Sequence, residues 1–535
     1  MLFSPTATNL SALEFKTSGG TLSGGFDTTI STGAAWRVEE RDEDLVGSYN
    51  GGKAPHVNGD DGNLNYDRGI VSQVSKVIHE LDLHYLNYSF FGRMNYFYDA
   101  VNANKDELSG DAKAQVGADV DILDAYIKGD FHINDNPLNV RLGNQVLSWG
   151  ESAFIQNGIN IINPVDVSKL RSPGSELRDA LIPVPIVSAS FDITENVNLE
   201  GFYQFVYKAT EIDSPGTYFS TSDIVGDGGE ILWLGPEGAP GAGIPRTDRD
   251  VRDNGQFGTA IHVLVPPLNS TEFGLFYLHY HSRLPVVSAR TGTPDGLKNN
   301  DYPGSARYIV EYPEGIHVFG VSFNTMLKES GIALQGEYSF RPNMPLQVDA
   351  NELVSCIFTP LNANTYTSQL GTYDFNEYIQ GFKTHKAGQV QVTASKLFGP
   401  NNPFGASNIL VLGEIGFTHV YDLEHKDSLK YDGPETSVAD AFSSGYHVMT
   451  QMDYPNAIGV AKLSPKIAFS HDIYGISPGP GGNFLEGRKA LSIGLGVSLL
   501  ERWQANLNYT NYFGAGDINL IHDRDFVVMD VKYFF

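Results

Sequence analysis

The chain has 535 residues, and its 63 acidic side chains against 36 basic ones give a formal net charge of −27. A surface this acidic repels phosphate backbones, which argues against a nucleic-acid-binding protein. Hydrophobic residues make up 41% of the chain, but no stretch approaches the roughly 20 apolar residues of a membrane-spanning helix, so a helical membrane protein is excluded. The abundant glycine and aromatic residues favour strands and turns.

Residues 1–19 are interpreted as an N-terminal segment ahead of the first predicted strand. A secretory signal needs a basic region followed by an apolar one, and the first basic residue here is Lys16. The stretch 10–12 (LSA) resembles the small-residue site at which signal peptides are cleaved. Residues 1–12 are therefore interpreted as the remnant of a signal peptide, and residues 20–535 as one domain.

Period-two alternation of apolar and polar residues runs through most of the chain and predicts strands with two different faces. Near the C-terminus, for example, Leu491, Ile493 and Leu495 alternate with Ser492 and Gly494. About 18 strands are predicted, with 16 as the alternative count. In chain order they cover 20–38, 71–86, 88–100, 119–133, 137–149, 184–195, 197–212, 255–266, 271–284, 315–327, 331–342, 384–397, 408–421, 443–454, 460–472, 488–500, 503–514 and 524–535.

The links between these predicted strands alternate strictly between short and long. Soluble sandwiches also have alternating strands, but tight turns at one end and long loops at the other are typical of an outer-membrane β-barrel. The predicted strands also reach the 9–11 residues that a tilted membrane strand requires. The sequence therefore predicts an all-β, antiparallel transmembrane barrel in the outer membrane of a Gram-negative bacterium, in contact with lipid and lipopolysaccharide.

Aromatic residues gather near the ends of the predicted strands, where the interfacial girdles of membrane barrels lie. They include Tyr85, Tyr88, Tyr96, Tyr98, Tyr203, Tyr207, Trp503 and Tyr533. The last strand ends on an aromatic tip in which Tyr533 and Phe535 share one face. This tip resembles the signal that the barrel assembly machinery reads, so that machinery is an expected partner.

A barrel of this size encloses water unless something plugs it. Charged side chains are inexpensive on the wet inner face, whereas each would cost about 2–4 kcal/mol at the lipid-facing midplane. The residues expected to face the lumen are Arg93, Lys128, Arg141, Glu200, Lys208, Glu337, Glu414 and Lys532. The plainer interpretation is that these side chains only solvate the wall.

The segment 149–185 fits neither a strand nor an ordinary surface loop. Prolines interrupt it, a helical turn is predicted at 174–181, and its apolar side chains would be exposed in water as a loop. We expect it to fold into the barrel and form a constriction or hatch; the alternative is a loop packed on the rim. The ligand or constriction candidates are Trp149, Phe154, Ile155, Asn157, Ile159, Asn160, Ile162, Asn163, Arg171, Glu176 and Arg178, with the apolar residues of 154–165 as the pocket.

A weaker pattern places Asp61, Asn63, Asn65 and Asp67 at alternate positions, where their oxygens could surround a calcium ion. Tyr66 stands where such a loop needs glycine, and these residue types also form ordinary turns. A turn without a metal is the preferred interpretation. Neither a cofactor nor an enzymatic activity is expected, because no nucleophile elbow, zinc-binding helix or phosphate loop occurs.

Three stretches resemble one known family, the proteobacterial outer-membrane proteins called domain of unknown function 1302. They are 58–69 (NGDDGNLNYDRG), 464–475 (SPKIAFSHDIYG) and 141–185, which begins RLGNQVLSWGESAF. The resemblance covers nearly the whole chain. It implies the handling of hydrophobic compounds such as lipids, sterols or hydrocarbons, with a periplasmic or RND-type transporter as a partner. It implies no particular catalytic or binding residues.

Three functions are compatible with these observations. The leading hypothesis is a channel or transporter for hydrophobic or amphipathic small molecules, with 149–185 as its hatch. The second is a general diffusion porin for polar solutes, in which Arg171, Glu176 and Arg178 set ion preference at a charged eyelet. The third is the outer-membrane component of a lipid export system.

Overall fold

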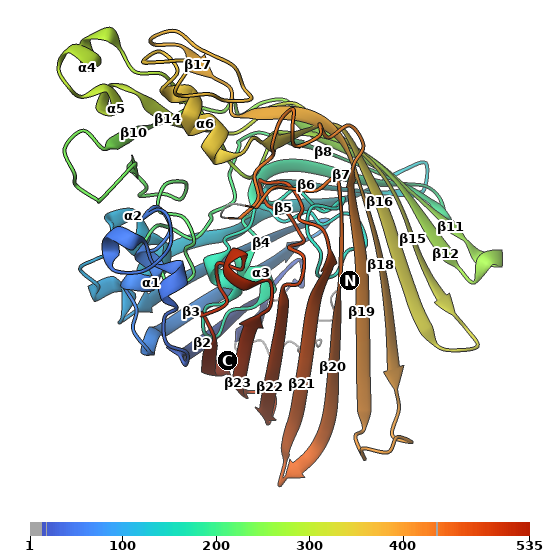
Figure 1. The fold of residues 1–535 in the computed structure, drawn as a ribbon. Helices are drawn as coiled ribbons and strands as arrows, with labels where there is room; N and C mark the ends of the chain where they lie inside the picture. The colour runs from blue at the N-terminus through green and yellow to red at the C-terminus, as the bar shows by residue number, and fades with distance from the viewer. Residues whose placement is uncertain (1–12, 18, 435–436) are drawn as a thin grey trace.

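The computed structural model describes residues 13–17, 19–434 and 437–535. The interpretation of residues 1–12 as a signal-peptide remnant lies outside these described residues. Within them, 18 long antiparallel strands form one closed barrel, because the last strand pairs with the first long one. The predicted count is confirmed. Figure 1 shows the C-terminal strands in red and orange at the front of this barrel, with the blue β2 and β3 beside them.

The barrel strands match the predicted ranges closely. In ring order they are β2 (Leu22–Arg37), β3 (Gly69–Tyr85), β4 (Tyr88–Asp99), β5 (Ala118–Ile133), β6 (Asn136–Gln145), β7 (Val184–Thr194), β8 (Val197–Gln204), β11 (Gln256–Val265), β12 (Thr271–Tyr280), β15 (Ile316–Leu327), β16 (Ile332–Gln347), β18 (Phe382–Phe398), β19 (Asn408–Val420), β20 (Phe442–Ile458), β21 (Ala461–Tyr474), β22 (Lys489–Leu499), β23 (Trp503–Phe513) and β24 (Phe526–Phe534). Every neighbouring pair is antiparallel, and β24 closes the ring on β2.

The alternation of the sequence becomes the two faces of the wall. In β15, Phe319 and Val321 are exposed on the outer face of the barrel. Val318, the residue before Phe319, is fully buried on the inner face. The same outward belt of exposed apolar side chains continues around the ring. It includes Leu142, Ile261, Leu275, Val390, Ile415, Val448, Ile467, Ile493, Leu507 and Met529. A belt this large is unfavourable in water and is typical of a barrel that spans the outer membrane.

Aromatic side chains are exposed near the strand ends as predicted, among them Tyr85, Tyr98 and Trp503. Tyr207 is an exception, because the predicted strand 197–212 ends at Gln204. Beyond this point the backbone N–H of Tyr207 donates to Asp253 Oδ1 (2.9 Å) and its hydroxyl donates to Ser282 O (2.6 Å). Tyr207 therefore packs among loop residues and does not belong to the girdle.

The long loops carry secondary structure that the sequence analysis did not predict. A second, five-stranded sheet stands beyond the long-loop end of the barrel, at the upper left of Figure 1. It consists of β9 (Ile231–Trp233), β10 (Gly243–Asp248), β13 (Val286–Arg290), β14 (Arg307–Glu311) and β17 (Tyr378–Ile379), with α4 (Pro294–Lys298), α5 (Tyr302–Ser305) and α6 (Ala350–Ile357). Their sequences, such as 243–248 (GIPRTD), show no clear alternation of apolar and polar residues.

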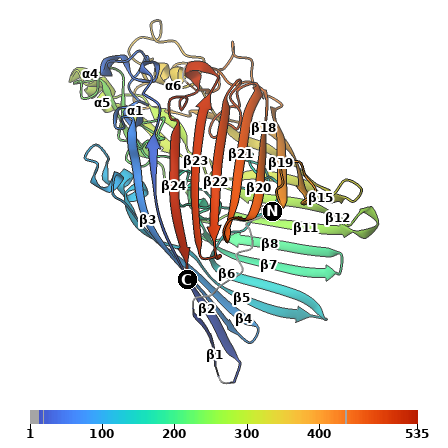
Figure 2. The same ribbon diagram turned by 90° about the horizontal axis from the view of Figure 1, so that it is seen from below.

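The N-terminal segment contributes one short strand, β1 (Leu13–Lys16). It pairs with the first residues of β2, which extend beyond the stretch of β2 that pairs with β24. Figure 2 shows this hairpin reaching past the C-terminus. Phe535, at the end of the chain, exchanges two backbone hydrogen bonds with Thr28. The aromatic tip of Tyr533 and Phe535 therefore lies at the seam that closes the barrel, and its role as an assembly signal stays a prediction.

Three further α-helices lie in the described loops: α1 (Asp61–Leu64), α2 (Gly110–Val116) and α3 (Leu177–Ala180). Among the described residues, no helix is both long and apolar enough to cross a bilayer. The helical turn predicted at 174–181 corresponds to α3, which lies within the barrel outline in Figure 1.

Candidate functional site

The chain between β6 and β7, residues 146–183, lies inside the barrel, and we call it the hatch. The predicted segment was 149–185, but residues 184 and 185 already belong to β7. The hatch is bonded to β5 through Lys169 and Asp121 (2.9 Å) and to β19 through Glu414. These two strands are nine positions apart in the ring of 18, on opposite sides of the lumen. The hatch therefore crosses the lumen.

Glu414 holds one turn of the hatch through backbone N–H groups. Its Oε1 accepts a hydrogen bond from Ala153 N (2.9 Å), and its Oε2 accepts from Phe154 N (2.6 Å) and Ile155 N (2.8 Å). Three amides converging on one carboxylate form charge-assisted hydrogen bonds, which are stronger than neutral ones. The ring of Phe154 also stacks on His447 of β20, with 5.6 Å between ring centroids.

Glu337 on β16 binds the backbone of a second turn of the hatch in the same way. It accepts hydrogen bonds from Glu151 N (2.6 Å) and Ile159 N (2.9 Å). On the same strand, Arg341 donates to the carbonyl of Gly158 (2.7 Å). The lumen charges predicted at 337 and 414 therefore bind the hatch backbone, and they do more than solvate the wall.

The apolar side chains of the hatch form a core with the wall. Trp149, Ile159, Ile161 and Ile162 are buried in one cluster with side chains of β8, β11, β12 and β15. The Trp149 indole donates to Glu200 Oε2 (2.7 Å). In the described conformation these residues are packing residues. Their surface is covered by the wall in this conformation, and a ligand pocket formed by the apolar residues of 154–165 stays a prediction.

The wall makes room for these side chains with glycines. A Cβ atom placed on Gly320 would lie 2.7 Å from Ile159 Cδ1, and one placed on Gly416 would lie 2.6 Å from Ile155 Cδ1. Both distances are well below an ordinary van der Waals contact of 3.5–4.0 Å. The inner wall and the hatch are therefore complementary in shape at these two points.

Asn163 closes the base of the hatch. Its Oδ1 accepts from Leu147 N (2.8 Å), and its Nδ2 donates to the carbonyls of Gln145 (3.1 Å) and Ile182 (3.0 Å). It thus joins the outgoing and returning chain where β6 and β7 meet. Asn157 donates to Gly481 O (2.7 Å) in the loop after β21, and Asn160 is exposed.

Ion pairs attach α3 to the wall. Asp179 accepts from Lys76 of β3 (2.9 Å) and pairs with Arg93 of β4. Both cations are almost fully buried, so breaking one partner leaves an uncompensated charge, which is strongly destabilising. Of the lumen candidates, Arg93 is therefore a structural contact of the hatch.

The three residues proposed for a charged eyelet are also paired. Glu176 accepts from Lys532 of β24 (2.9 Å), and Arg178 donates to Glu80 of β3 (2.8 Å). Arg171 pairs with Asp213, and its guanidinium lies 4.1 Å above the ring of Phe219. Each of the three charges thus has a counter-charge within the protein.

Of the remaining lumen candidates, one contacts the hatch and two contact residues of the barrel wall. Lys208 lies beyond the end of β8, in a loop and not on a strand as predicted, and donates to Pro183 O of the hatch (3.0 Å). Lys128 pairs with Asp130 (3.0 Å) on its own strand. The guanidinium of Arg141 lies 5.7 Å above the Tyr126 ring.

A pocket lies between the hatch and the inner face of β2, β3 and β4, at the long-loop end of the barrel. The cavity has a volume of about 80 Å³ and is partly open to solvent. Its apolar lining comes from the wall, the hatch and three loops: Ala35, Tyr66, Val71, Val74, Phe97, Val116, Pro173, Tyr218 and Phe219. This volume is below the roughly 300–1,000 Å³ of an ordinary small-molecule site, so a ligand of that size needs the hatch or the loops to move apart.

Polar groups from the hatch complete the pocket. They include Ser168, Lys169, Arg171, Ser175 and Asp179. Of the predicted ligand candidates, only Arg171 lies in this lining. Sequence reasoning missed the aromatic pair at 218 and 219, although large apolar side chains in a long loop were the signal that had identified the hatch.

The predicted calcium set is not brought together. Asp61 begins α1, and Asn63 is buried against Arg37 (3.0 Å). Asn65 donates to Gly216 O (2.9 Å), and Asp67 pairs with Arg41 at the surface. The four side chains of this weaker pattern therefore have separate partners, because side chains two residues apart on a helix point in different directions. The preferred interpretation, a turn without a metal, stays a prediction.

The family model described as "Protein of unknown function (DUF1302)" matches residues 1–535. The chain belongs to the DUF1302 family. The family resemblance read from the sequence is thereby confirmed. No curated protein sequence matches this DUF1302 chain.

Solved structures with a similar outline share little sequence with this chain. The Acinetobacter baumannii protein OccAB3 has a TM-score of 0.43 and 10% identity, over 96% of this chain and 99% of its own. A BenF-like porin from Pseudomonas fluorescens Pf-5 has a TM-score of 0.44 and 8% identity, over 96% and 98%. Pseudomonas aeruginosa OpdK with vanillate has a TM-score of 0.42 and 9% identity, over 95% and 98%. Scores this low say nothing about substrate or mechanism.

Proposed function

We propose that the protein is a gated outer-membrane channel for hydrophobic or amphipathic small molecules. The observation that carries the proposal is the pocket between the hatch and β2–β4. It lies at the end of the long loops, which face the outside of the cell in outer-membrane barrels. A molecule bound there rests on the hatch itself, so that its binding can favour a second position of the hatch.

The lining of the pocket supports this substrate class. Most of the exposed lining surface is apolar, as in most small-molecule sites. The three lining cations are already paired: Lys76 with Asp179 (2.9 Å), Lys169 with Asp121 (2.9 Å) and Asp166 (3.1 Å), and Arg171 with Asp213. An anionic ligand would have to displace these carboxylates. A ligand with a large apolar surface and a few hydrogen-bonding groups fits without that cost.

A general diffusion porin is less well supported. An eyelet that selects ions needs charges that face the passing solute. Here Glu176 and Arg178 are engaged by Lys532 and Glu80 on the wall. The hatch also reaches opposite sides of the barrel. Both features favour a lumen that is closed until the hatch moves.

Replacing Val74 by tryptophan tests the pocket. Val74 is buried on β3 and lines the pocket, so the larger ring fills space that a ligand would occupy. We expect the Val74→Trp variant to lose most of the barrel-dependent uptake of N-phenyl-1-naphthylamine, a neutral aromatic amine. The measurement is the rate of its fluorescence increase in intact cells that produce the barrel.

Val390→Trp is the matched control, because Val390 points outward from β18 into the lipid-facing belt. Uptake by this variant is expected to equal that of the wild type. Retention of the gel-mobility shift that folded barrels show on heating establishes that both variants fold. Equal uptake by the wild type and the folded Val74→Trp variant would rule out the pocket as the route.

A further inference from the structure

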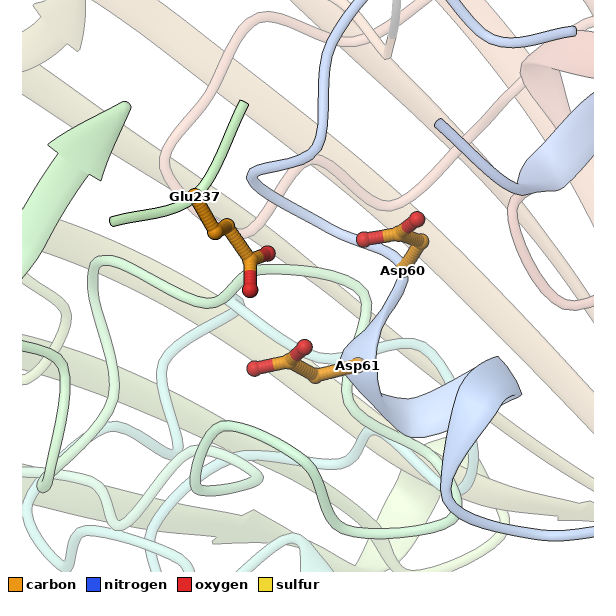
Figure 3. A group of neighbouring side chains, drawn as sticks. All are labelled: Asp60, Asp61 and Glu237. Carbon is orange, nitrogen blue, oxygen red and sulfur yellow. The ribbon is translucent and has the colours of Figure 1, made fainter. Parts of the chain in front are cut away.

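Three carboxylates from two separate loops point into one space among the long loops, beyond the end of the barrel. Asp60 and Asp61 stand at the start of α1, in the loop between β2 and β3, and Glu237 lies in the loop between β8 and β11. Figure 3 shows the three side chains directed toward one another. One oxygen from each carboxylate lies within 4.8 Å of the other two.

Asp60 has an unsatisfied oxygen at this point. The side chain is buried, with the residue only 1% exposed. Its Oδ2 accepts from Gly47 N (2.7 Å) and Asn50 Nδ2 (3.1 Å), but its Oδ1 has no hydrogen-bond partner among the described residues. A buried polar atom without a partner is unfavourable, and more so when it is charged. A cation bound at Asp60 Oδ1 would supply the missing partner.

A fourth carboxylate lies directly behind the cluster. Asp223 Oδ2 is 3.4 Å from the backbone nitrogen of Asp61, which donates to it, and Asp223 Oδ1 is also buried without a partner. Four carboxylates thus lie close together between the two loops, and two of their buried oxygens have no hydrogen-bond partner among the described residues.

We propose that Asp60, Asp61 and Glu237 form a calcium site that joins the two loops. Calcium binds oxygen at 2.3–2.6 Å, so that ligands on opposite sides lie about 4.6–5.2 Å apart. The three oxygens here all lie within 4.8 Å of one another, so that one ion can reach all of them. Magnesium usually keeps several waters and takes only one or two carboxylates, whereas calcium accepts more oxygen ligands in a flexible geometry. Backbone carbonyls and water complete the shell.

The site braces the outer wall of the pocket. Tyr66 follows α1 in the first loop, and Tyr218 lies in the second; both line the pocket, and their rings are in edge contact at 5.6 Å. Asn65 already ties the two loops through Gly216 O (2.9 Å). A cation bound between the loops would hold these two tyrosines at a fixed separation. The calcium site does not depend on the proposed transport function.

The test is calorimetric titration of calcium into the purified full-length barrel in detergent, after removal of divalent ions with EDTA. We expect one calcium to bind to the wild type. The double variant Asp61→Asn and Glu237→Gln is expected to bind at least 100-fold more weakly. Asp60 is left intact, because it also holds Gly47 N and Asn50 in place.

Asp67→Asn is the matched control: the carboxylate comes from the same loop but pairs with Arg41 away from the cluster, so binding should be unchanged. The same titration with magnesium should give weaker binding. Calcium binding that is equal in the wild type and the double variant would overturn the proposal by assigning the heat to other acids or to lipopolysaccharide phosphates. Absence of binding to the folded wild type would overturn it as well, and would mean that protons neutralise the cluster.

Discussion

Replacing Glu337 and Glu414 together by glutamine is expected to open the lumen. Each carboxylate now accepts backbone N–H groups of the hatch on both of its oxygens. A glutamine offers one acceptor oxygen and turns an NH₂ group toward the remaining amide. Each amide left without a partner costs about 1–3 kcal/mol, which favours detachment of residues 151–159. Single-channel recording in planar bilayers should then show frequent opening steps that the wild type lacks.

Glu272→Gln provides the control for this experiment. Glu272 belongs to β12 and pairs with His262 (3.1 Å) instead of with the hatch. Its substitution also removes one wall carboxylate, but the bonds that hold the hatch remain. If the Glu272→Gln barrel stays closed while the double variant conducts, the loss of the hatch contacts causes the opening. If the folded double variant stays as closed as the wild type, the two carboxylates do not hold the hatch shut.

A disulfide between the hatch and β2 is expected to abolish uptake reversibly. A Cβ atom on Gly174 would lie 3.3 Å from Ser31 Cβ, close to the separation of about 3.5–4.5 Å in disulfides. The variant Ser31→Cys with Gly174→Cys would fix the part of the hatch that borders the pocket. Uptake of N-phenyl-1-naphthylamine should fall to the level of cells without the barrel and recover after dithiothreitol.

The single-cysteine variants serve as controls for this tether. Gly174 has a φ of +69°, so its substitution alone introduces some strain, and uptake by that single variant sets the reference. The native Cys356 is buried in α6, against the five-stranded sheet, and does not compete for the new bond. Undiminished uptake by the fully oxidised barrel would show that the ligand passes without movement of this part of the hatch.

The barrel could be predicted because its signal is local and repeated. Each strand needs one apolar face toward lipid, and residues such as Phe319 and Val321 reveal that face by their spacing alone. The alternation of short and long links then orients every strand. The outer sheet could not be predicted, since strands such as Gly243–Asp248 depend on partners far away in the sequence.

The candidate site was predicted only in outline. Apolar residues in a long loop imply a covered surface, and this argument placed the hatch inside the barrel. It could not show what covers them: Ile159 lies over Gly320, a match between residues far apart in the chain. The pocket was missed for the same reason, because Val74, Phe97 and Tyr218 belong to three separate segments.

The central claim, that the hatch closes the lumen, is tested most directly by single-channel conductance of the wild type and of a barrel lacking residues 150–182. The deletion suits this fold, because Gln145 and Val184 are paired across β6 and β7 and residues 146–149 with Pro183 can still connect them. A closed wild type and large, steady steps from the deletion variant are the predicted result. Equal, steady conductance of both barrels would contradict the account and identify an open diffusion pore.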